Sequence, residues 1–181
     1  MRKKSKFNAD QYIDRNYVEN EDAIISIYIK DVDDFYNEFD ADDLTLSDDI
    51  IKFINSRVEN ISYKYSITLE FDSPIIAREE KGKLIDIIKS QYGLASSLKQ
   101  KELKTNKLKA FIFFIIGTLF LLLSYSSTNY GSLVKDILSI AGWVAVWETV
   151  SVLIFDTIKI RTTKLKADRL YNAKIEFKER K

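Results

Sequence analysis

Three polar residues stand close together inside an otherwise apolar stretch of the sequence: Glu148, Thr149 and Ser151. They lie within residues 137–155, where Glu148 is the only ionisable residue. A carboxylate in the middle of such a stretch costs about 2.5 to 3.5 kcal/mol to insert into a bilayer, and it normally faces a bundle interior or an aqueous cavity. If copies of the chain bring their Glu148 residues together, the carboxylates form an acidic ring that favours cations in a pore. The alternative is that Glu148 is protonated or hydrogen-bonded to a serine or threonine of its own chain and only fixes packing.

Few other residues could carry out chemistry. The 181-residue chain contains no cysteine and no histidine, which excludes thiolate nucleophiles, imidazole bases and zinc sites built from these residues. Its five glycines form neither a phosphate-binding loop nor a nucleophile elbow. We therefore predict that the protein is not an enzyme and has no catalytic residues, no metal and no cofactor. A membrane enzyme acting on lipids or nucleotides would need acids clustered around a metal, which the spacing does not show.

A second set of candidate residues is basic and follows the second apolar run. These residues could contact an anionic ligand or lipid: Lys159, Arg161, Lys164, Lys166 and Arg169. Attraction to an anionic leaflet already explains them, since each cation near the surface contributes about 1 kcal/mol. A ligand that carries phosphate would have to bind at the basic residues of the two outer flanks or at Lys52, Arg57 and Lys64, because the acidic segment 31–49 would repel phosphate. That segment lacks the glycine of a calcium-binding EF-hand loop and is predicted to be a solvated face.

The candidate residues are positioned by two apolar runs, 110–127 and 137–155. The first carries no charge over 18 residues, about 27 Å of helix, which is close to the thickness of a bilayer core. We predict a transmembrane hairpin with helices over 108–127 and 137–155, joined by an external loop over 128–136. Basic residues crowd both outer flanks and the loop holds only Lys135, which predicts a membrane protein with both termini in the cytoplasm. The alternative is a hairpin buried in a soluble core, but soluble helices rarely lack charge on every face.

Residues that could pack the two spans are either small or aromatic: Ala141, Ala145, Trp143, Trp147, Gly117 and Ser124. At 100° per residue the two alanines share a helix face with Glu148, and the two tryptophans lie on the far side. Small residues permit close helix approach. These faces therefore predict tight packing within one hairpin or a homo-oligomer.

The rest of the chain predicts an α+β cytosolic domain of about three strands with covering helices. A polar arm over 1–22 precedes it, and the domain occupies 23–107. Alternating apolar residues predict strands at 23–30 and 61–71, and an apolar stripe predicts a helix over 48–59 that covers them.

Two further helices connect this domain to the spans. The first is predicted to start with Ser73 as its cap and Pro74 at its first position, with Gly93 as a possible bend before it enters the first span. After the second span, 156–181 predicts a basic helix and a terminal strand over 173–178. An isolated strand would expose unpaired backbone, so we expect this strand to return to the sheet.

Several stretches resemble a widespread, largely uncharacterised family of small bacterial two-span membrane proteins. The resemblance is carried by AGWVAVWE at 141–148, by Phe155-Asp156 and by Arg169-Leu170-Tyr171. The segment from the first strand through Phe35-Tyr36-Asn37 and Phe39-Asp40 is similar to the same family. It implies the architecture described above rather than an activity. The chain departs from the family at Thr149 and Ser151, where relatives often carry a proline and a second acid.

The layout is also similar, more loosely, to two-span membrane effectors of anti-phage defence systems that are controlled by a nucleotidyltransferase product. This likeness implies a homo-oligomer in the lipid bilayer that depolarises the cell or forms an ion channel. Its cytosolic domain would gate it, with a nucleotidyltransferase-derived nucleotide or oligonucleotide as ligand. The alternative is a non-conducting, membrane-anchored adaptor that recruits a cytosolic partner through the acidic segment 31–49 or an exposed face of the sheet.

Overall fold

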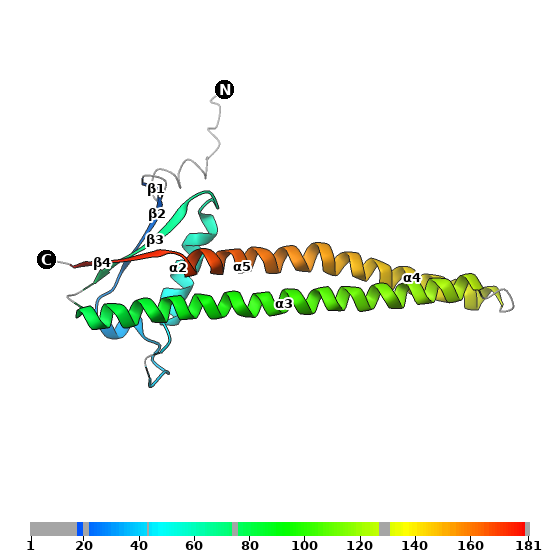
Figure 1. Ribbon diagram of the computed structural model, residues 1–181, viewed down its shortest axis with the longest axis horizontal. Helices are drawn as coiled ribbons and strands as arrows, with labels where there is room; N and C mark the ends of the chain where they lie inside the picture. The colour runs from blue at the N-terminus through cyan, green and yellow to red at the C-terminus, as the bar shows by residue number, and fades with distance from the viewer. Residues whose placement is uncertain (1–17, 20–21, 43, 74–75, 127–130, 180–181) are drawn as a thin grey trace, which may run out of the picture. The chain divides into compact units, whose positions relative to one another are not determined.

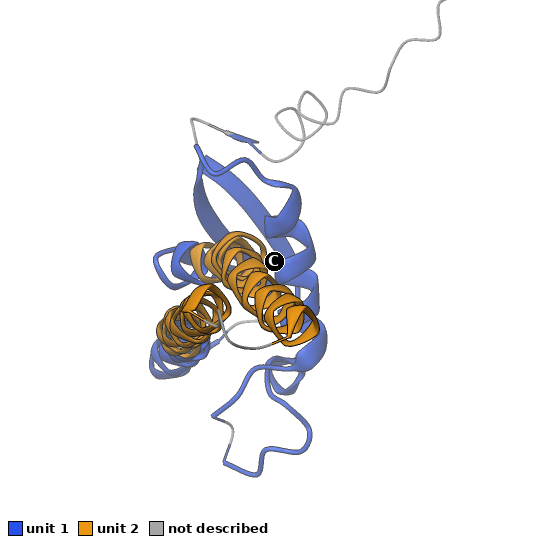
Figure 2. Cartoon of the chain, turned by 90° about the vertical axis from the view of Figure 1, so that its right-hand side faces the viewer, with its two compact units in different colours: residues 1–95, 166–181 blue, residues 96–165 orange. Residues whose placement is uncertain are grey.

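The computed structural model describes residues 18–19, 22–42, 44–73, 76–126 and 131–179 (Figure 1). These residues belong to two compact units: unit 1 comprises 1–95 and 166–181, and unit 2 comprises 96–165 (Figure 2). Most of the predicted N-terminal arm, together with Pro74 and residues 128–130 of the predicted loop, lies outside the described residues.

Unit 1 contains a small sheet with the strand order β1-β2-β3-β4. The strands are β1 (Val18–Glu19), β2 (Asp22–Tyr28), β3 (Ser66–Ser73) and β4 (Lys174–Glu179). The last three are parallel to one another, and the short β1 is antiparallel to β2. The prediction of three strands with a returning C-terminal strand is therefore confirmed, although β3 begins at Ser66 rather than at Ile61.

One face of the sheet forms the core of unit 1. In register, Ile27 of β2 lies beside Phe71 of β3, which lies beside Phe177 of β4. The rings of Phe71 and Phe177 stack at 5.5 Å, and the ring of Phe35 lies 5.2 Å from that of Phe71. Phe35 and Phe71 are fully buried, and Phe177 is half-buried. Full burial of a phenylalanine side chain contributes about 1.5 to 3 kcal/mol, so this aromatic group is a main source of stability for the sheet.

Two helices supply the other side of this core. Helix α2 (Asp48–Asn60) buries one apolar stripe that includes Ile54, as the spacing predicts. Helix α3 (Arg78–Ser126) contributes Leu84, Ile88 and other residues of its first turns.

The start of α3 differs from the prediction. Ser73 is the last residue of β3 and is buried, and the helix begins only at Arg78. Ser73 therefore does not cap a helix that starts at Pro74. Helix α3 continues through Gly93, the position of the possible bend, without a break. A Cβ at Gly93 would lie 3.2 Å from ring carbons of Tyr171, so this glycine permits a close approach within unit 1.

Unit 2 contains the apolar parts of two helical segments. The second segment consists of α4 (Ser132–Ser151), a single π-helical turn η2 (Val152–Asp156) and α5 (Thr157–Tyr171). Both segments are long and apolar enough to cross a membrane. Only 17% of the most apolar 18-residue window in α3 and 22% of that in the second segment are buried. Most of their large apolar side chains are therefore exposed.

The two segments pack through a seam of small residues. On α3 the residues buried in unit 2 recur every seven positions, namely at Leu103, Ala110, Gly117 and Ser124. Gly142 lies opposite, since a Cβ at Gly117 would be 3.0 Å from its carbonyl oxygen. A seven-residue repeat of small residues permits this close approach between helix backbones.

The seam predicts the effect of enlarging one glycine. We expect Gly117→Val to lower the free energy of unfolding by about 1 to 3 kcal/mol, because the added atoms meet backbone that cannot move aside. The measurement is an SDS titration in detergent, followed by tryptophan fluorescence, since both tryptophans lie on α4. Gly82→Ala is the control, because nothing lies within 4 Å of its added Cβ. Equal stability of Gly117→Val and the wild type would contradict the seam.

Candidate functional site

Helix α4 places the three polar residues in different surroundings. Thr149 is buried in the seam, where its Oγ1 lies 3.1 Å from the carbonyl oxygen of Ala145 and 3.4 Å from that of Ala110. Glu148 and Ser151 are half-buried. Within the described residues, no group donates a hydrogen bond to the Glu148 carboxylate or forms an ion pair with it. The proposed intrachain hydrogen bond of Glu148 to a serine or threonine is therefore not formed here.

The predicted packing residues also separate into groups. Gly117 and Ser124 lie in the seam, where Ser124 Oγ donates a hydrogen bond of 2.9 Å to the carbonyl oxygen of Lys135. Ala141 and Ala145 are half-buried, and the large aromatic side chains of Trp143 and Trp147 are exposed. At 100° per residue the Glu148 side of α4 lies next to the seam rather than in it.

Sequence reasoning missed three members of the seam, and for one of them, Leu103, it made no prediction at all. Gly142 was noted only as part of a resemblance, and Ala110 only as the start of an apolar run. The seven-residue spacing of Ala110, Gly117 and Ser124 is the signal that could have found the α3 side.

The five basic candidates are divided between the two units. Lys159, Arg161 and Lys164 belong to unit 2, and Lys166 and Arg169 belong to unit 1. Lys166 Nζ lies 2.5 Å from Glu59 Oε1, and this hydrogen bond and the lysine charge lower the pKa of Glu59.

The Arg169 guanidinium is used within unit 1. It donates hydrogen bonds of 2.9 to 3.2 Å to three carbonyl oxygens at the end of α2 and before β3, those of Ile61, Ser62 and Tyr65. It also lies 4.9 Å from the centre of the Tyr63 ring. Desolvation lowers the pKa of Arg169, although an arginine stays charged in proteins. Arg169 therefore orders the turn into β3, a role that no sequence pattern predicts.

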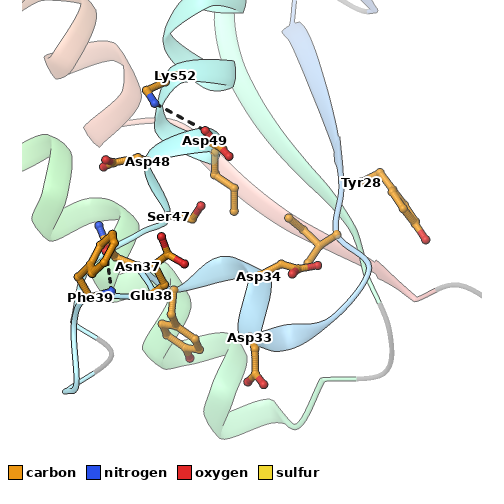
Figure 3. Close-up of a pocket in the computed structure, with 13 residues that line it drawn as sticks. Tyr28, Asp33, Asp34, Asn37, Glu38, Phe39, Ser47, Asp48, Asp49 and Lys52 are labelled. Carbon is orange, nitrogen blue, oxygen red and sulfur yellow. Dashed lines mark hydrogen bonds and ion pairs between the residues drawn. The ribbon is translucent and has the colours of Figure 1, made fainter.

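The acidic segment borders a cavity of about 600 Å³ in unit 1 (Figure 3). Its acids come from η1 (Val32–Phe35), from the following loop and from the first turn of α2: Asp33, Asp34, Glu38, Asp48 and Asp49. Lys52 also lines it and lies 3.6 Å from Asp49. Among the described residues, no group of three or more acids is arranged to hold a metal ion.

Comparison with protein-family models, curated proteins and solved structures finds no match to this chain. The two-span family and the defence effectors therefore remain resemblances in sequence and layout.

Loss of the Arg169 hydrogen bonds should loosen the turn before β3. We expect Arg169→Ala to lower the stability of unit 1 by about 2 kcal/mol, because charged hydrogen bonds to carbonyl oxygens are lost. Hydrogen–deuterium exchange of residues 61–73 in the full chain measures the effect, which should appear as faster exchange. The control is Arg161→Ala in the same helix, whose side chain is exposed. Unchanged exchange in the Arg169 variant would show that these contacts are not stabilising.

Proposed function

We propose that the protein is a homo-oligomer of the bacterial inner membrane that depolarises the membrane through a cation-conducting pore. The carrying observation is Glu148, a half-buried carboxylate in the middle of an apolar helix without a hydrogen-bond or ion-pair partner in the described structure. Such a group is costly in lipid, and contact with an aqueous path or with neighbouring copies removes that cost.

Insertion into a membrane is supported by the outward faces of the two apolar segments. A hairpin in a soluble core would bury these faces, whereas most of the apolar windows are exposed. The outward residues are large and apolar and include Phe111, Ile115, Leu119, Trp143 and Trp147. Basic residues before the first segment and after the second favour an orientation with both termini in the cytoplasm.

Oligomerisation is supported by the way the seam is used. Gly117, Ser124, Gly142 and Thr149 already pack within one chain. A second copy would use a different face, and the side of α4 with Ala141, Ala145 and Glu148 is small enough for close approach. Symmetric association there would bring one carboxylate from each copy toward a common axis.

Control by the α+β unit is supported by chain connectivity. Helix α3 runs without a break from unit 1 into unit 2, and α5 returns to unit 1. Ligand binding to unit 1 could bias the spans through these helices. By the likeness to defence effectors, the signal would be a nucleotide or oligonucleotide, with Lys159, Arg161 and Lys164 as candidate contacts.

A second candidate function is a non-conducting adaptor. The acid-lined cavity at Asp33, Asp34, Asp48 and Asp49 favours it, because the cavity would suit a basic segment of a cytosolic partner. In that case the chain would be monomeric in the membrane and would copurify with a basic partner.

The two functions differ in ion flux and in the effect of one substitution. We expect the wild-type protein in liposomes to pass cations in preference to chloride. Glu148→Gln should bring the ratio of cation to chloride permeability close to one, because the acidic ring is neutralised. Reversal potentials of reconstituted bilayers measure the preference. Asp136→Asn, at the other end of α4, should retain it.

Expression in bacteria provides the test in cells. A potential-sensitive dye should report depolarisation by the wild type. With Glu148→Gln the extent of depolarisation should differ from that of the wild type. Unchanged potential and growth, with the protein confirmed in the membrane fraction, would overturn the pore and favour the adaptor.

A further inference from the structure

Unit 2 contains a second cavity, of about 340 Å³, next to the ends of the two apolar runs. The α3 side is lined by Lys99, Glu102 and Asn106, and the other side by Asp156, Lys159 and Thr163. We propose that this cavity binds the headgroup of an ethanolamine phospholipid, a phosphate joined to a primary ammonium.

The position of the cavity along the helices fits the headgroup layer of a bilayer. Asn106 precedes Ala110 by four residues and Lys159 follows Phe155 by four, about 6 Å of helix in each case. Asp156 directly follows Phe155. The polar headgroup layer occupies roughly the first 5 to 8 Å beyond the hydrocarbon core. Once the apolar runs span a bilayer, these three residues therefore lie at headgroup depth.

The cavity is lined by charges of both signs, and not all of them form ion pairs within the chain. Lys99 and Glu102 pair with each other at 2.6 Å. Asp156 and Lys159 are three residues apart on one helical segment, yet within the described residues neither has an ion-pair partner. A zwitterionic headgroup matches this arrangement, because its phosphate can accept from Lys159 and its ammonium can donate to Asp156.

Asn106 adds a polar group that lacks a partner. Its Nδ2 is shielded from water and makes no hydrogen bond in the described structure. A shielded donor without an acceptor is unfavourable, so an acceptor at this position would be stabilising. A phosphate oxygen in the cavity would supply one after rotation of the side-chain amide, whose last torsion is broad.

The π-helical turn lies directly beside this group of residues. Turn η2 ends at Asp156, and Thr157 Oγ1 donates a hydrogen bond of 3.1 Å to the carbonyl oxygen of Val152. Single π turns inside helices occur frequently at functional sites. Here the turn sets the angular position of Asp156 relative to the preceding apolar helix.

The headgroup chemistry makes the proposal specific. Phosphatidylglycerol carries a phosphate and no ammonium, so Asp156 would repel it. Phosphatidylcholine has three methyl groups on its nitrogen and cannot donate hydrogen bonds to a carboxylate. We expect the full chain in detergent to bind phosphatidylethanolamine about tenfold more tightly than either lipid, the ratio that one charged hydrogen bond supplies.

The test is native mass spectrometry of the full chain with each of the three lipids. Asp156→Asn should remove the preference for phosphatidylethanolamine over phosphatidylcholine, and Lys159→Gln should weaken the binding of all three. Asp136→Asn is the matched control. It lies near the start of α4, away from the cavity, and should bind the lipids as the wild type does. A wild type without lipid preference, or an Asp156→Asn variant that keeps it, would overturn the site.

The inference rests on membrane insertion, which is one part of the proposed function, and not on conduction. Alkaline extraction of membranes from expressing cells tests insertion separately. A protein released by this treatment would remove the membrane assignment itself. A protein that stays in the membrane but shows no lipid preference would overturn only the headgroup site.

Discussion

The parallel pairing of β4 with β3 is the constraint on which the rest of the chain depends. Adjacent parallel strands need a crossover connection, which is commonly a single helix. Here the connection runs from Ser73 to Lys174 and contains both apolar segments. Both ends of unit 2 therefore connect to unit 1, so the two basic flanks belong on one side of any membrane that the segments cross.

This topology links the stability of the two units. Closing the connection costs conformational entropy that grows only slowly with its length, and the seam of unit 2 already holds its two halves together. The stacking of Phe71 on Phe177 then fixes β4 in register. Formation of the seam and docking of β4 each reduce the entropy cost of the other. Such coupling is what unit 1 needs if it is to influence the apolar segments.

Much of unit 1 could be predicted from the sequence because burial is one-sided. The alternation in β2 and β4 and the stripe of Ile50, Ile54 and Val58 in α2 follow from it. The start of β3 could not be predicted, since Tyr63 and Tyr65 continue the alternation but belong to the turn that Arg169 orders. Strand order depends on contacts between distant segments, which no local period encodes. The two-residue β1 pairs with the nearby start of β2 and is too short to show an alternation.

The candidate site was predicted less completely for a related reason. A helical wheel groups Ala145 with Glu148, but it does not say which face the partner helix occupies. The structure gives that face to Gly142 and Thr149, so Thr149 separates from the polar group in which its sequence position had placed it. Likewise, the sequence positions of Lys166 and Arg169 suggest cations that face a membrane. In the structure Lys166 pairs with Glu59, and Arg169 donates hydrogen bonds to three backbone carbonyl oxygens.

The hydrogen bonds of the seam bear directly on the role of Glu148. Ser124 and Thr149 are the buried hydroxyls on the two facing helices, and both donate to carbonyl oxygens of the same chain. The seam thus forms without a hydrogen bond or ion pair to the Glu148 carboxylate within the described residues. In lipid such a carboxylate would be unfavourable unless it is protonated or meets water or other copies of the chain. The proposed association of several copies around water would supply such contacts, and for this reason the proposed pore is placed between chains.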